Sequence, residues 1–114
     1  MKLLLDTNLV VEIGKGSFLQ VIYDSFPGAE LFVLEASLDE MEYIGGNAAH
    51  RARNMVRKLL EDGKLVMLES EGYVDDLLVE YNKEYIVATI DKELLGRLQG
   101  KKVTLRSGKL QIMA

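Results

Sequence analysis

The sequence contains no cysteine, no tryptophan, one histidine and one proline among its 114 residues. Without cysteine the chain has neither a disulfide scaffold nor a thiolate ligand, and His50 alone is too little for a zinc site of the usual kind. Any metal site must therefore use oxygen ligands. No apolar run approaches the roughly 18 residues of a membrane-spanning helix, and the apolar start ends at Asp6, too early for a signal peptide. We expect a cytoplasmic protein with no membrane partner.

What the chain does contain is enough apolar and charged material for one compact domain over residues 1–114. Hydrophobic residues make up 48% of the sequence and charged residues 28%. The formal net charge of −4 excludes a uniformly basic nucleic-acid-binding domain. The charge is nevertheless uneven, because residues 47–64 and 92–114 together hold 11 of the 14 Lys and Arg. Solvated helix faces would explain such blocks, and so would a basic rim that holds a polyanion around an acidic centre.

Short apolar runs alternate with stretches of helical periodicity. The runs expected to form strands are Leu3–Leu5, Leu31–Leu34, Leu65–Leu68, Tyr85–Ala88 and Val103–Leu105, with a final strand within Gly108–Met113 that pairs back as a hairpin. The stretches expected to form helices are Leu9–Ile13 continuing to Phe18–Phe26, Ser37–Ile44, Asn47–Glu61, Asp75–Asn82 and Lys92–Gln99. This order predicts an α/β fold, a three-layer α/β/α sandwich with a mostly parallel central sheet.

Acidic residues follow the ends of the predicted strands. Asp6 follows the first strand, Glu40 lies in the helix after the second, and Asp91 follows the fourth. Asp75 and Asp76 open the helix before that fourth strand, where a carboxylate often serves only to cap the helix. For Asp75 we favour this capping role. Asp6, Glu40, Asp76 and Asp91 are expected to meet in one crevice, because ligands of open α/β sheets bind at the carboxyl ends of the strands.

Four clustered carboxylates repel one another unless a cation neutralises them. Mg²⁺ and Mn²⁺ prefer such oxygen ligands, and they activate water for attack on a phosphodiester. Asn8 and Thr89 are candidates to orient a carboxylate or a water, and each is equally suited to a turn or a cap.

Four stretches of the chain resemble the PIN-domain family of metal-dependent ribonucleases. They are Leu4–Asn8, Leu38–Glu42, Val74–Leu78 and Ile86–Leu94, and together they span nearly the whole chain. The segments Val87–Asp91 and Leu105–Lys109 look more like the branch that processes ribosomal RNA in archaea and eukaryotes than like the VapC toxins.

The resemblance implies a Rossmann-like fold, an acidic metal site and, commonly, a homodimer. The implied metal and catalytic residues are Asp6, Glu40, Asp76 and Asp91, with Asn8 and Thr89 in support. We choose Asp76 over Asp75 because an apolar pair follows it directly, as in the motif. The short spacing from Asp76 to Asp91 leaves open which of the two aspartates faces the site.

These observations predict an endoribonuclease that uses Mg²⁺ or Mn²⁺ on single-stranded or structured RNA, either in RNA processing or as the toxin of a toxin–antitoxin pair with an antitoxin partner. The alternative is a catalytically weak or inactive RNA-binding or assembly module with the same fold. For Tyr43 and Tyr73, near the acids in the sequence, both packing and stacking on bases remain open. The candidate RNA contacts are Arg51, Arg53, Arg57, Lys92, Arg97 and Arg106.

Overall fold

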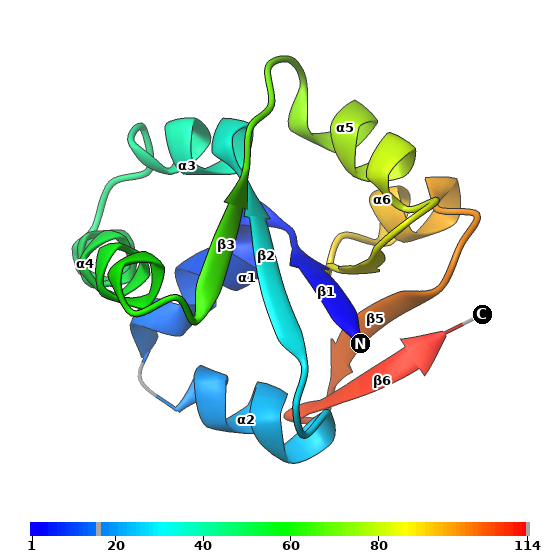
Figure 1. Cartoon of the computed structure of the whole chain (residues 1–114), viewed down its shortest axis with the longest axis horizontal. Helices are drawn as coiled ribbons and strands as arrows, with labels where there is room; N and C mark the ends of the chain where they lie inside the picture. The colour runs from blue at the N-terminus through cyan, green and yellow to red at the C-terminus, as the bar shows by residue number, and fades with distance from the viewer. Residues whose placement is uncertain (16, 114) are drawn as a thin grey trace.

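The computed structural model describes residues 1–15 and 17–113 and shows one six-stranded sheet with helices around it (Figure 1). The strands are β1 (Lys2–Leu5), β2 (Glu30–Leu34), β3 (Leu65–Leu68), β4 (Ile86–Ala88), β5 (Lys102–Arg106) and β6 (Lys109–Met113). The helices are α1 (Thr7–Glu12), the 3₁₀ turn η1 (Ile13–Lys15), α2 (Phe18–Ser25), α3 (Glu35–Met41), α4 (Asn47–Glu61), α5 (Val74–Tyr81) and α6 (Lys92–Arg97). The described helices include none with the length and apolar character that crossing a membrane requires.

The sheet has the strand order β3-β2-β1-β4-β5-β6. The first five strands are parallel, and β6 runs antiparallel to β5, which confirms the predicted hairpin. Its turn, Ser107-Gly108, has positive φ at both residues (51° and 75°), as a two-residue hairpin of type I′ requires.

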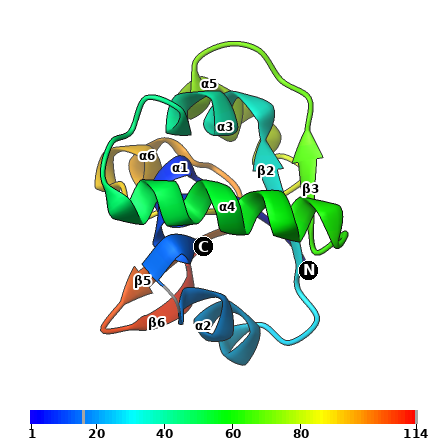
Figure 2. The ribbon, with the colours of Figure 1, turned by 90° about the vertical axis from the view of Figure 1, so that its left-hand side faces the viewer.

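Alternate side chains along the buried strands face two separate cores. Leu3 and Leu5 of β1 point to one core, whereas Leu4 points to the other. The first core is filled mainly from α1, α2 and α4, and the second from α5 and α6. The predicted three-layer α/β/α arrangement with a mostly parallel sheet is therefore confirmed. Figure 2 looks onto α4, which lies across α1 with α3 above it and α2 below.

The connections between strands also change from one side of the sheet to the other at its centre. Chain segments after β1 and β2 cross on the side of the first core, and those after β3 and β4 cross on the side of the second. Strands β1 and β4 lie side by side, with Leu5 opposite Ala88. The carboxyl ends of these two strands thus form the switch point at which open α/β sheets bind their ligands.

Two helical predictions differ from the structure in their limits. The expected helix of Leu9–Ile13, continuing to Phe18–Phe26, is divided into α1, η1 and α2, because the 3₁₀ turn lays Gly14 against α4. A Cβ on Gly14 would stand 2.3 Å from the carbonyl oxygen of Ala48. Helix α3 begins directly after β2 at Glu35 rather than at Ser37, since the Ser70 hydroxyl accepts the Ala36 N–H at 3.1 Å.

Candidate functional site

Asp6 lies at the switch point, immediately after β1, and is almost completely buried. Only 5% of the residue is exposed. Its Oδ1 accepts the N–H of Thr7 at 2.7 Å and so caps α1, and its Oδ2 accepts the hydroxyl of Thr89 at 2.6 Å. One carboxylate therefore caps α1 and also joins the end of β1 to the residue after β4.

The environment of Asp6 raises the pKa of its carboxyl group above the ordinary value of 3.8. Burial is the main cause, and the hydrogen bonds from Thr89 and Thr7 offset part of it. The negative charges of Asp75 and Glu40 raise the pKa further. Carboxylates from α3 and α5 thus lie close enough to act on the buried carboxylate after β1.

Thr89 and Asp91 continue the site from the end of β4. The Thr89 hydroxyl, which donates to Asp6, also accepts the N–H of Asp91 at 3.1 Å, so one buried hydroxyl positions both residues. Asp91 caps α6, because its Oδ1 accepts the N–H groups of Glu93 and Leu94 at 2.9 and 3.2 Å. The Asp91 charge also reaches across to Asp75, whose pKa it raises.

The two adjacent aspartates of α5 have different surroundings. Burial raises the pKa of Asp75, and the charges of Asp91 and Glu93 raise it further, while Arg97 lowers it. Asp76 instead points to solvent and forms an ion pair, with Arg97 Nη2 2.6 Å from its Oδ1. Asp75 therefore interacts electrostatically with Asp6 and Asp91, whereas the Asp76 chosen from the sequence is paired with Arg97.

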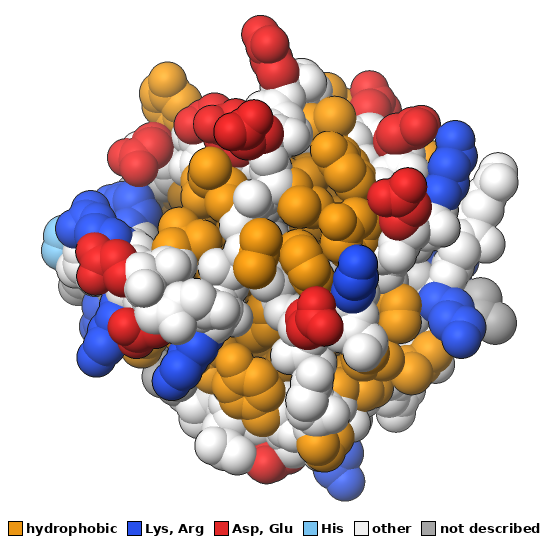
Figure 3. Space-filling model, viewed as in Figure 1, with side chains coloured by type: hydrophobic (Ala, Val, Ile, Leu, Met, Phe, Trp, Pro, Cys, Tyr) orange, Lys and Arg blue, Asp and Glu red, His pale blue; other side chains and the backbone are white. Residues whose placement is uncertain are grey.

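The two remaining acidic-site candidates, Glu40 and Asn8, are both exposed. Glu40 lies on the exposed side of α3, and its charge acts on Asp6. Asn8, in the first turn of α1, is exposed. Acidic side chains line the upper edge of the molecule, over α3 and the start of α5, while basic ones gather over α4 (Figure 3).

We refer to Asp6, Glu40, Asp75 and Asp91 as the acidic edge. Their donor chemistry fits a hard divalent cation, because with Thr89 and Asn8 they offer only carboxylate, hydroxyl and amide oxygens. Asp6 and Asp75 are held where their neighbours' charges disfavour ionisation, and a cation would relieve that repulsion. Within residues 1–15 and 17–113, however, no three acidic or histidine side chains stand close enough together to hold a metal ion. The acids form an edge rather than a closed cage.

The basic candidates on α4 have two kinds of environment. Arg51 Nε donates to the carbonyl of Gly14 at 3.1 Å. Arg53 donates to the carbonyls of Met41 and Ile44 at 3.0 and 3.1 Å and so fastens the end of α3 to α4. Arg57 is exposed. Arg51 and Arg53 thus join α4 to neighbouring segments through backbone carbonyls, and both Arg51 and Arg57 are exposed.

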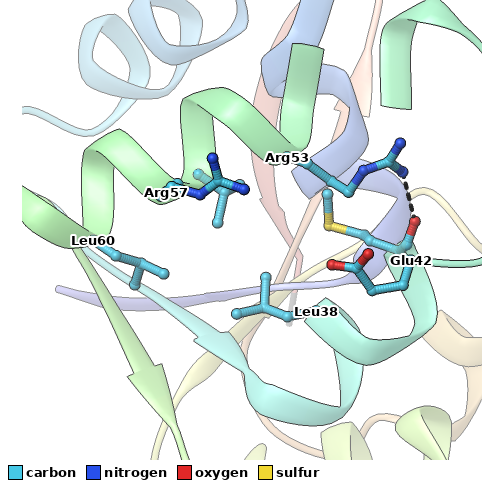
Figure 4. A pocket seen from close by; sticks show the side chains of 7 residues that line it. Leu38, Glu42, Arg53, Arg57 and Leu60 are labelled. Carbon is cyan, nitrogen blue, oxygen red and sulfur yellow. Dashed lines mark hydrogen bonds between the residues drawn. The ribbon is translucent and has the colours of Figure 1, made fainter. Parts of the chain in front are cut away.

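A hollow of about 190 Å³ lies between α3 and α4, beside the Arg53 contact. Leu38 and Leu60 contribute to its apolar lining, and Glu42 and Arg57 add charged groups (Figure 4).

The basic candidates of the second block lie in two places. Lys92 and Arg97 belong to α6, next to Asp91 and Asp76 respectively. Arg106 ends β5 and is exposed, and the adjoining hairpin turn lies beside α2, where Gly108 and Lys109 share a hollow with Asp24. The α6 cations therefore adjoin the acidic edge.

Two acids near the site were not selected from the sequence. Asp75, Leu78 and Asn82 are spaced i, i+3 and i+7, so they lie on one face of the helix, and Leu78 and Asn82 are buried. This spacing is a signal that could have identified Asp75 as the inward-facing aspartate. Glu93 acts on Asp75 from the first turn of α6. A glutamate two residues after a capping aspartate is common at the start of any helix, so the sequence gives no separate signal for Glu93.

The sequence matches no protein-family model and no curated protein. The structure is similar to one described as that of the PIN domain endonuclease Utp24, with a TM-score of 0.73. The similarity covers 97% of this chain and 90% of that chain at 19% sequence identity. The chain therefore has a PIN-domain fold, as the sequence resemblance implied, and its function has to be argued from the site.

Proposed function

We propose that this protein is an endoribonuclease that hydrolyses single-stranded or loop RNA, with Mg²⁺ or Mn²⁺ held by Asp6, Glu40, Asp75 and Asp91. The observation that carries the proposal is the buried Asp6 at the switch point, within electrostatic reach of Asp75 and Glu40. A buried carboxylate that faces two others is costly for folding alone. It is the usual arrangement where a cation is to be bound.

A divalent ion held there would lower the pKa of a bound water and stabilise the leaving oxygen of the phosphodiester. The chain's own part is to hold the acids in place. Thr89 is a positioning residue, since its hydroxyl joins Asp6 to the backbone of Asp91. The first turn of α6 fixes the Asp91 carboxylate through two N–H groups.

The similarity to a PIN domain endonuclease supports the same function at the level of fold. The basic side chains over α4 and on α6 supply positive charge on both sides of the acidic edge, where they can hold a polyanionic strand. RNA is therefore the proposed substrate, and Arg57, Lys92 and Arg97 are the exposed basic candidates on α4 and α6 that make no hydrogen bond to a backbone carbonyl among the contacts described above.

The second candidate function is an RNA-binding module without catalysis. It is favoured by the finding that, in the part of the chain the structure describes, no three acids stand close enough to hold a metal ion. Such a module would bind RNA in a salt-dependent way and leave it uncut.

The test is incubation of the protein with an RNA that has single-stranded loops, with Mn²⁺ or with chelator. Wild type is expected to cut only with Mn²⁺, and Asp6→Asn and Asp91→Asn are expected to lose cleavage. Salt-dependent binding without any cutting would establish the non-catalytic module instead. Cutting that survives chelator and both substitutions would contradict the proposal.

A further inference from the structure

Tyr73 has a solvent-exposed aromatic side chain and lies close in sequence to Asp75 of the acidic edge. It is 67% exposed, precedes α5 as its capping residue and lies two positions before Asp75. Tyr81 and Tyr85 use their rings for packing, in an edge-to-face contact with centroids 5.9 Å apart, and the exposed Tyr43 lies after α3 rather than next to Asp75. An exposed ring beside a proposed cleavage site is the kind of surface on which an unpaired base stacks.

Arg97 lies beside the first turn of α5 and forms a solvent-exposed ion pair with Asp76. Its Nη2 is 2.6 Å from Asp76 Oδ1, and the two side chains are 42% and 66% exposed. Exposed ion pairs of this kind contribute little stability, so another anion can displace one partner at small cost. A phosphate offers the guanidinium a stronger, bidentate arrangement.

Tyr73 and Arg97 both adjoin the first turn of α5. Asp76, which binds Arg97, is three residues after Tyr73 on the first turn of α5, and α5 packs beside α6 (Figure 1). The hydrogen bond to Asp76 raises the pKa of Arg97, and the negative charges of Asp76 and Asp75 add to this effect. The first turn of α5, which carries Asp75, therefore has an exposed aromatic residue before it and an arginine bound to it.

We propose that Tyr73 and Arg97 form a subsite for one nucleotide of single-stranded RNA, in which the base stacks on Tyr73 and a phosphate replaces Asp76 on Arg97. The subsite rests on the proposed function for the identity of its ligand. It also gives Asp76 a role outside the metal site, as the anion that holds Arg97 until RNA arrives. Bases of a duplex are stacked and paired within it, so the subsite selects unpaired strands.

The test measures binding rather than cleavage. A fluorescently labelled single-stranded RNA of about 12 nucleotides, matched with its duplex, is titrated by anisotropy in Mg²⁺ buffer. All proteins carry Asp6→Asn so that the strand stays intact. Tyr73→Ala is expected to weaken single-strand binding about 5- to 150-fold, as the loss of one base stack does, whereas Tyr73→Phe keeps the affinity.

Arg97 and Asp76 are tested by the direction of their effects. Arg97→Ala is expected to weaken binding and reduce the slope of log Kd against log salt by about one, and Arg97→Lys to restore part of both. Asp76→Asn is expected to tighten binding, because Arg97 loses its competitor. Lys83→Ala is the control, since it removes one cation beyond the far end of α5 from a comparable exposed pair with Glu80.

The possible results distinguish failure of the proposed subsite from failure of the proposed nuclease function. Tyr73→Ala with unchanged affinity, weaker binding by Asp76→Asn, or equal affinity for duplex would overturn the subsite even if wild type cuts RNA. Binding that depends on Tyr73 while wild type cuts nothing would support the subsite and overturn the nuclease. No RNA binding by any variant would overturn both.

Discussion

The folded structure destabilises the ionised form of the Asp6 carboxyl group relative to its protonated form. With 5% of the residue exposed, water solvates little of the charge, and the hydrogen bonds from Thr7 and Thr89 offset only part of that loss. The raised pKa of Asp6 expresses this cost. Between the ordinary pKa of 3.8 and the raised value, the folded state binds more protons than the unfolded state, so stability falls as pH rises through this window.

Asp6→Asn is therefore expected to stabilise the metal-free protein at pH 7 by about 0.5–2 kcal/mol, since the amide retains hydrogen-bond partners without a buried charge. The advantage should shrink as pH falls towards 4, because the wild-type carboxyl becomes protonated. Urea unfolding in chelator at several pH values measures both effects. A variant less stable than wild type at pH 7 would contradict this account of Asp6.

Thr89 is expected to matter through the two residues it positions. Thr89→Val removes the hydroxyl that donates to Asp6 and accepts from Asp91, and it should lower cleavage about 10- to 100-fold, as the loss of a residue supporting metal ligands does. Thr89→Ser keeps the hydroxyl and is the matched control. The measurement is the single-turnover rate against Mn²⁺ concentration, and equal rates for the two variants would contradict the positioning role.

The sequence located the acids after β1 and β4, because a polar residue directly after a buried apolar run must lie at the strand end. It did not settle which aspartate of α5 faces the site. That choice depends on the rotation of α5 about its axis, which Val74 and Leu78 set by their burial in the second core. Asp76 lies on the opposite stripe with the exposed Glu80 and Lys83.

Strands and helices were predictable wherever local pattern decides them. The apolar runs Leu31–Leu34 and Leu65–Leu68 became β2 and β3, and Asn47–Glu61 is α4 with the predicted limits. The start of α3 was not predictable, because its partner Ser70 is 34 residues away along the chain. The break between α1 and α2 likewise depends on the contact of Gly14 with a helix formed much later in the sequence.

Gly14 is expected to be irreplaceable at the crossing of η1 and α4. In Gly14→Ala the added Cβ would meet two backbone atoms, 2.3 Å from the Ala48 oxygen and 2.7 Å from the Ala52 nitrogen. Neither atom can rotate away, so the variant should lose about 1–3 kcal/mol or more. Gly96→Ala, in α6 with nothing within 4 Å, should instead gain up to about 1 kcal/mol of helix propensity. Thermal unfolding compares the two, and equal melting temperatures would contradict the close packing of η1 on α4.

At the scale of the whole molecule, the mild average charge conceals an ordered distribution. The strand order places β1 beside β4, so the acid-bearing ends of two segments about 80 residues apart become neighbours. Helices α3 and α5 then bring Glu40 and Asp75 to the same edge, and the cations of α4 and α6 lie beyond it. A short chain thus assembles an acidic edge with basic surfaces on either side.

The proposed nuclease cleaves RNA through a set of acids that includes Asp75 and excludes Asp76. This assignment is tested by the single-turnover cleavage of a single-stranded RNA in Mn²⁺, compared for wild type, Asp75→Asn and Asp76→Asn. Because the two variants remove one carboxylate each from adjacent positions of the same helix turn, each controls for the other. We predict that Asp75→Asn loses cleavage by about 100-fold or more, while Asp76→Asn still cuts. Loss of cleavage in Asp76→Asn alone, or full cleavage by both variants, would contradict it.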